Sequence, residues 1–221
     1  MFAYSLTGLE ISEDATGGVL EVEESEITAR SAVYQVLGRL FAVPDAEFAG
    51  KSGSGQWVAD FTEAAEFLAF DWEIGEAPTD GDLSEEALRE QYERLFLAEH
   101  DGVRRICGGA YVAGREQNLV ELRRAYEYYG LGTGTDDVPF DHLTAEVDFM
   151  QFLAFKEAAA SSPRLGKSFH RAQVDFLDRQ LGDWLPEFAE AVRGSDPTPL
   201  YAWATDRLES FVVADATWVA R

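Results

Sequence analysis

The sequence predicts an all-α protein of about seven or eight helices packed around one core. Apolar residues recur along most of the chain at the three- and four-residue spacing of a helix face. No segment alternates polar and apolar residues in the way that predicts a strand. The chain has 221 residues, of which 46% are hydrophobic, and this suffices for one domain with a sizeable core.

Two regions are expected along the chain. Residues 1–25 are acidic and weakly periodic, which predicts a mobile tail, and residues 26–221 then form the helical domain. The first helix can be capped by Ser25 and ends at Pro44. Its buried stripe consists of Val33, Val36, Leu37, Leu40 and Phe41.

Turn signals and periodicity place the other helices. A turn at Lys51–Gly55 precedes a second helix from Trp57 to Leu68, and Ser84 caps a third. Residues 99–117 have no clear period and predict a long connection, a kind of segment that often carries function. The later helices are expected at Asn118–Tyr129, from Asp141 to about Ala160, at residues 164–181, at Trp184–Arg193 and at Leu200–Ala214.

The segment Phe140–Met150, F-D-H-L-T-A-E-V-D-F-M, carries the strongest functional signal. It follows a glycine-containing break, and Asp141 stands at the helix start, where a carboxylate can cap free N–H groups. His142 and Glu146 are four residues apart, so they lie one turn above each other. An Asp-His pair in this place is either a recognition element or a cap.

The net charge of −23, from 41 acidic and 18 basic residues, restricts the partners. Such a surface repels phosphate backbones and anionic lipids, so we expect neither nucleic acid nor membrane insertion. Two compatible explanations remain. The charge can adapt the protein to high salt, or it can attract a basic peptide.

The single cysteine, Cys107, excludes an internal disulfide and a cysteine-based metal cluster. Beside Arg104 and Arg105 it is either a thiol with a lowered pKa or a small, partly buried side chain. No uncharged run exceeds nine residues, and no basic segment precedes an apolar one at the N-terminus. We therefore expect a cytoplasmic protein.

A catalytic interpretation has little to build on. His142, Glu146 and Asp148 could form a metal-dependent hydrolase site, but such a site needs three converging protein ligands. No phosphate-binding loop occurs, and a lone G-x-G at Gly132 and Gly134 follows no strand. We expect no metal, no cofactor and no enzymatic activity, with the hydrolase kept as an alternative.

Binding is the better interpretation. Five Trp, eight Tyr and 15 Phe on a helical framework favour apolar grooves that accept an amphipathic peptide. Tyr92 and Phe96 have the helical spacing of core residues, and they could also line such a groove. An acidic rim would steer a peptide with a basic head.

Three segments together resemble the TorD/DmsD/NarJ family of chaperones for molybdenum-containing oxidoreductases. They are V-Y-Q-V-L-G-R-L-F-A-V-P-D (Val33–Asp45), Y-E-R-L-F-L (Tyr92–Leu97) and D-H-L-T-A-E-V-D-F-M (Asp141–Met150). The resemblance covers most of residues 27–215 and implies a TorD-like fold.

The resemblance also implies a function. Such proteins bind the catalytic subunit of a molybdopterin oxidoreductase of the nitrate or dimethyl sulfoxide reductase type, often at its twin-arginine signal peptide, until the cofactor is inserted. They act without catalysis, as monomers or homodimers. An acidic scaffold protein without a maturation role is the remaining alternative. The implied client-binding residues are Asp141, His142, Glu146 and Tyr111, joined by Phe140, Tyr92 and Phe96 if these line the groove.

We predict that the protein is least stable at low ionic strength. Repulsion among its 41 acidic side chains is unscreened there, because the Debye length is about 30 Å at roughly 0.01 M salt. Thermal unfolding in dilute buffer and in molar salt measures this. A melting temperature that does not rise with salt would contradict salt adaptation and leave peptide attraction as the account of the charge.

Overall fold

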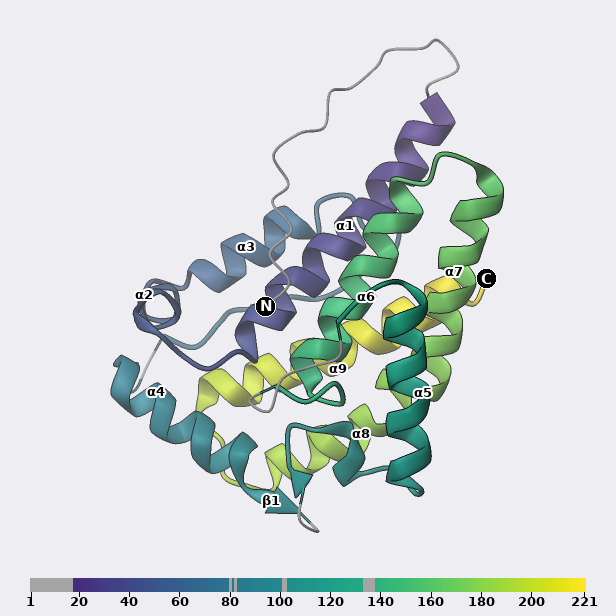
Figure 1. Ribbon diagram of the computed structural model, residues 1–221. Coiled ribbons are helices and arrows are strands. Elements are labelled where there is room, and N and C mark those ends of the chain that lie inside the picture. Colours follow the sequence, from purple (N-terminus) through teal and green to yellow (C-terminus); the bar gives the residue numbers. More distant parts are fainter. Residues whose placement is uncertain (1–17, 80, 82, 101–102, 133–137) are drawn as a thin grey trace.

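The protein is helical over most of its described length, as predicted. The computed structural model describes residues 18–79, 81, 83–100, 103–132 and 138–221 (Figure 1). Among these residues, no helix is both long and apolar enough to cross a membrane. The nine α-helices in this part of the chain are α1 (Gly18–Leu40), α2 (Ala46–Ser54), α3 (Gln56–Ala64), α4 (Glu85–Tyr92), α5 (Arg115–Tyr128), α6 (Leu143–Ala158), α7 (Pro163–Arg179), α8 (Leu181–Arg193) and α9 (Pro199–Val219).

The helices α1 and α6 lie side by side, and α3, α7, α8 and α9 pack against this pair (Figure 1). Helix α3 packs on α1, and α7 packs on α6. Helix α9 contacts α1, α7 and α8. The core therefore lies between one central helix pair and a surrounding layer, as in other helix bundles.

Aromatic rings fill much of this core. Phe96 is fully buried and packs against the rings of Phe41, Tyr92, Phe188 and Tyr201. The Tyr92 hydroxyl is satisfied, because it donates to the carbonyl of Phe41 at 3.2 Å. The prediction that Tyr92 and Phe96 belong to the core is confirmed.

Helix α2 was not predicted. It covers residues 51–54 of the turn predicted at Lys51–Gly55, so that prediction is wrong. Asp45 caps α2 by accepting from the N–H of Phe48 at 2.9 Å. The helix then continues to Ser54, and Gly55, with a φ of 70°, ends it and opens α3. Only Phe48 and Ser52 of α2 are buried, so the sequence shows no helical period there.

Residues 99–117, predicted as an irregular connection, contain short regular elements. Before this segment, the π-helix η1 (Glu93–Leu97) continues α4. The segment itself begins with the strands β1 (Glu99–His100) and β2 (Val103–Arg104), which form an antiparallel hairpin. A 3₁₀ turn, η2 (Gly108–Ala110), comes next. Strands of two residues are too short to show alternation, which explains why the sequence pattern misses them.

The start of α8 also differs from the prediction, by three residues. It begins at Leu181 and not at Trp184. Gly182 makes this possible, because a Cβ at that position would lie 2.2 Å from the carbonyl oxygen of Leu177. The two helices therefore meet at a corner that only glycine fits.

The first and the last helix are both longer than predicted. Helix α1 begins at Gly18, inside the predicted tail, and α9 continues past Ala214 to Val219, whose side chain is buried. The rest of the predicted tail, residues 1–17, lies outside the described residues.

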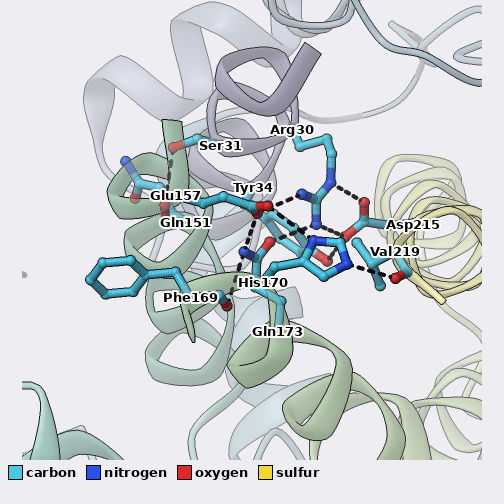
Figure 2. A network of polar contacts seen from close by, with 10 residues as sticks. All are labelled: Arg30, Ser31, Tyr34, Gln151, Glu157, Phe169, His170, Gln173, Asp215 and Val219. Atoms are coloured by element: carbon cyan, nitrogen blue, oxygen red, sulfur yellow. Dashed lines mark hydrogen bonds and ion pairs between the residues drawn. The ribbon is translucent and has the colours of Figure 1, made fainter. Parts of the chain in front are cut away.

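A buried polar network joins α1, α7 and α9 (Figure 2). The Arg30 guanidinium is fully buried and donates to both carboxylate oxygens of Asp215. It also donates to the Gln173 side-chain oxygen at 2.7 Å, and the Tyr34 hydroxyl donates to Asp215 at 2.7 Å. These hydrogen bonds support the buried pair, as a buried ion pair requires, and the remaining guanidinium nitrogen, Nη1, lies 3.8 Å from a Glu157 carboxylate oxygen without a hydrogen bond.

The same network reaches α6 and the end of α9 through His170 (Figure 2). Its Nδ1 lies 2.9 Å from a Glu157 carboxylate oxygen, and its Nε2 lies 3.0 Å from the Val219 carbonyl oxygen. Both partners are acceptors, so the ring satisfies both only as an imidazolium. In agreement, the hydrogen bond to Glu157 raises the pKa of His170.

Candidate functional site

The start of α6 is fastened to the segment before η2 by backbone hydrogen bonds. The N–H of Leu143 donates to the Ile106 carbonyl at 2.9 Å, and the N–H of Gly108 donates to the Asp141 carbonyl at 2.7 Å. We call residues 106–109 and 141–143 the α6 clasp. It holds the predicted motif against a loop more than 30 residues earlier in the chain.

Asp141 belongs to the clasp and does not cap α6. Its Oδ2 accepts from the N–H of Gly109 at 3.2 Å, and its side chain is 1% exposed. The N-cap is His142, whose Nδ1 accepts from the N–H of Thr144 at 3.2 Å. The cap interpretation of Asp141 is therefore wrong, because the helix begins one residue later than that interpretation requires.

Burial governs the protonation of this motif. It raises the pKa of Asp141, although the Gly109 N–H and Arg115 oppose the shift. It lowers the pKa of His142 to about 4, with a smaller contribution from the charge of Arg104. His142 is therefore neutral at neutral pH, in agreement with its role as an acceptor.

Glu146 lies one turn further along α6 and contacts α8. Its Oε2 accepts from the Trp184 indole N–H at 3.1 Å, and burial raises its pKa well above the usual range. The Trp184 ring stacks on Tyr111, with ring centres 5.8 Å apart and an angle of 8°. The Tyr111 hydroxyl donates to the Arg105 carbonyl at 2.9 Å. Trp184 thus connects two predicted site residues, but its sequence pattern indicates only a core position.

Two glycines allow this close packing. A Cβ at Gly108 would lie 2.8 Å from the Trp184 Nε1 and 3.0 Å from a Glu146 oxygen. A Cβ at Gly109 would lie 2.7 Å from the Asp141 Oδ2. The chain has to carry glycine at both positions for the clasp to close.

Five of the seven predicted client-binding residues lie inside the protein, and two are partly exposed. Phe140 accepts through its carbonyl from the Tyr126 hydroxyl at 3.0 Å, and the Arg123 guanidinium lies 5.2 Å from its ring centre. Tyr111 is the other partly exposed member. The buried residues are Tyr92, Phe96, Asp141, His142 and Glu146.

The residues of the hydrolase alternative do not converge. Asp148 faces α1, where a Cβ at Gly38 would lie 3.0 Å from its Oδ1, while Glu146 faces Trp184. No group of three metal-ligating side chains occurs in the described part of the chain. Burial also raises the pKa of Cys107 to about 12, so the interpretation as a thiol with a lowered pKa is wrong.

A second candidate site lies between α1 and α3, and the sequence analysis missed it. It is a hollow of about 880 Å³, which we call the α1–α3 groove. Phe67 lines it and is 57% exposed. One feature of the sequence could have predicted this groove. Val36 stands directly before the core residue Leu37 and widens the apolar face of α1. The lining is completed by Ser25, Thr28, Ala29, Ala32, Gln35, Arg39, Lys51, Asp60, Glu63 and Ala64.

An all-helical bundle with an open groove, lined by both apolar and charged side chains, has the form of a binding protein. The model of the family described as nitrate reductase delta subunit matches residues 55–190, more than half of the chain. The chain belongs to this TorD-like chaperone family and is not an enzyme.

Relatives agree with this assignment. The perchlorate reductase assembly chaperone of Dechloromonas aromatica (strain RCB) is 31% identical over 199 residues, which are 84% of this chain and 88% of that protein. The selenate reductase assembly chaperone of Thauera selenatis is 41% identical over 85 residues, 38% of this chain and 44% of that protein. The chaperone TorD of Photobacterium profundum is 27% identical over 94 residues, 42% of this chain and 44% of that protein. No solved structure matches the chain.

We expect Gly108→Ala to destabilise the protein by about 1–3 kcal/mol, because the new methyl group collides with Trp184 and Glu146. Urea unfolding measures this. The control is Gly166→Ala in α7, where the nearest side-chain atom is 3.7 Å away and a gain of about 0.4–1 kcal/mol is expected. Equal stability of Gly108→Ala and wild type would contradict the close packing of the clasp.

Glu146→Gln should make the protein more stable than wild type, and increasingly so as the pH rises. Gln keeps an acceptor for Trp184 but cannot ionise. Because the folded-state pKa of Glu146 lies well above 4.5, the folded wild type holds a proton that the unfolded chain releases. Wild-type stability therefore falls from pH 4.5 up to the folded-state pKa, by up to about 1.4 kcal/mol per pH unit.

Urea unfolding of both proteins across this pH range tests the effect of Glu146. His142 is present in both proteins, so its own titration cancels in the difference. A difference in stability that stays constant with pH would show that Glu146 does not retain its proton in the folded protein.

Proposed function

We propose that this protein is a cytoplasmic, system-specific chaperone for a molybdopterin oxidoreductase. It binds the catalytic subunit, or its twin-arginine signal peptide, and keeps the enzyme from export until the cofactor is inserted. The observation that carries this proposal is the similarity to a perchlorate reductase assembly chaperone over 84% of the chain. Two further relatives are named for the assembly of selenate and chlorate reductases.

The α1–α3 groove fits the chemistry of such a signal peptide. Its apolar lining, with Val36, Ala64 and the exposed ring of Phe67, can cover an apolar run. The lining carries two cations, Arg39 and Lys51, and two carboxylates, and a charged hydrogen bond from arginine to a carboxylate is among the strongest that a groove can make. The two carboxylates are Asp60 and Glu63. Of these, Asp60 is already paired with Lys51 at 2.7 Å, so Glu63 is the better arginine partner.

The clasp has a supporting role in this proposal. Contact between the client and Asp141 or His142 stays a prediction, and burial gives it a specific form. Because both side chains are buried and Asp141 is bonded to Gly109, a client that contacts them has to displace part of the clasp. Tyr111 and Phe140 are the members of the predicted set that a client can touch while the clasp stays closed.

We expect a peptide with two adjacent arginines and an apolar run to bind with micromolar affinity or better, about −8 kcal/mol. Phe67→Ser should weaken this binding by about tenfold or more, because an exposed ring no longer covers the apolar run. Titration calorimetry measures both affinities. Val213→Ser is the matched control, since Val213 is 58% exposed and does not line the groove.

Equal loss of affinity in both variants would place the peptide outside the groove. If the wild-type protein binds neither signal peptides nor the apoprotein of any molybdoenzyme from the same organism, the chaperone proposal fails. The acidic scaffold protein would then be the better interpretation.

A further inference from the structure

A second hollow lies between the end of α5 and the first turns of α7. Its volume is about 620 Å³, and none of its lining residues belongs to the α1–α3 groove. Tyr128, which is 77% exposed, and Tyr129 come from the end of α5. The rest of the lining comes from α7 and consists of Pro163, Arg164, Lys167, Ser168, Arg171, Ala172 and Asp175.

The hollow is basic, although the protein has a net charge of −23. Arg164, Lys167 and Arg171 are exposed and three or four residues apart, so they share one face of α7. We call these three residues the α7 basic face. In the described part of the chain none of them forms an ion pair, whereas Lys51 and Arg193 each contact two carboxylates.

Helix stability does not explain this arrangement. Cations one turn apart repel each other, and the N-terminal end of a helix carries partial positive charge that disfavours Arg164. No acidic residue stands in the first turn of α7, although the chain has 41 of them. The α7 basic face therefore weakens its own helix, as a site that is completed by an external anion does.

We propose that the α7 basic face and the two tyrosines bind an acidic polypeptide segment on the body of the client reductase. This inference rests on the proposed function and adds a contact beyond the signal peptide. Carboxylates pair with arginine and lysine, and the tyrosine rings cover the apolar parts of the segment. Asp175 at one end of the hollow repels carboxylates, so they lie over the first turns of α7.

The remaining charge of the chaperone makes this contact selective. An acidic segment is repelled by most of a surface with a charge of −23 and is attracted at the α7 basic face. A basic signal peptide has the opposite preference. The α7 basic face thus favours acidic segments over basic ones, whereas the lining of the α1–α3 groove carries two cations and two carboxylates.

The test is a triple charge reversal, Arg164→Glu, Lys167→Glu and Arg171→Glu. All three side chains are exposed, so the fold should persist, and circular dichroism checks it. The control reverses three other exposed arginines, Arg124→Glu, Arg179→Glu and Arg221→Glu, and so changes the net charge equally. The probes are the apo-reductase subunit without its signal peptide and the isolated signal peptide.

We expect the triple variant to bind the apo-subunit at least about tenfold more weakly than wild type, and the control to stay within about twofold. Both variants should bind the signal peptide at least as well as wild type. If wild type binds the apo-subunit and the triple variant binds it equally well, the inference is wrong and the proposed function stands. Failure of wild type to bind either probe would defeat the proposed function itself.

A second copy of this chain is the other candidate occupant. Sedimentation of wild type and the triple variant distinguishes it. A self-association that disappears on charge reversal, with unchanged affinity for the apo-subunit, would assign the face to a homodimer and overturn the inference.

Discussion

The arrangement of the helices depends on one buried charge, the guanidinium of Arg30. An ion in the core costs several kcal/mol unless it is paired and hydrogen-bonded, so α1 has to place Arg30 against Asp215 of α9 and Gln173 of α7. A shift of any of these helices by one residue would leave the charge unpartnered. The network therefore fixes how α1 is rotated, and the opposite side of α1 is left to line the groove with residues such as Val36.

The α6 clasp also buries ionisable groups that need hydrogen-bond partners, here between the start of a helix and a loop. The Asp141 carboxyl group accepts from the Gly109 N–H and Glu146 accepts from the Trp184 indole N–H, and neither forms an ion pair within the described residues. Burial raises the pKa of both, so the neutral acid is favoured inside the protein. The clasp thus buries two carboxyl groups with few hydrogen-bond partners. We expect its free energy of local opening to be lower than that of the core around Arg30.

The sequence predicted the fold well where a helix buries a continuous stripe, as α1 does at Val33 and Leu37. It failed at α2, which buries too few residues to show a period. For the site, the Asp-His motif was found but its surroundings were not. Spacing within α6 says nothing about Gly108 and Trp184, which reach the motif from distant parts of the chain through tertiary packing. Both hollows arise in the same way, between helices that are not predicted to meet.

Under the proposed function, the two hollows would give the exposed cations of α7 a role in binding the client. A client that met only an acidic surface would be held by its basic signal peptide alone, through a flexible connection to its body. A second contact of opposite sign, on helices other than those of the groove, turns the binding of the body into an intramolecular step. Two weak contacts linked in this way would hold a client far more tightly than either does alone, and loss of one contact would leave only the weaker affinity of the other.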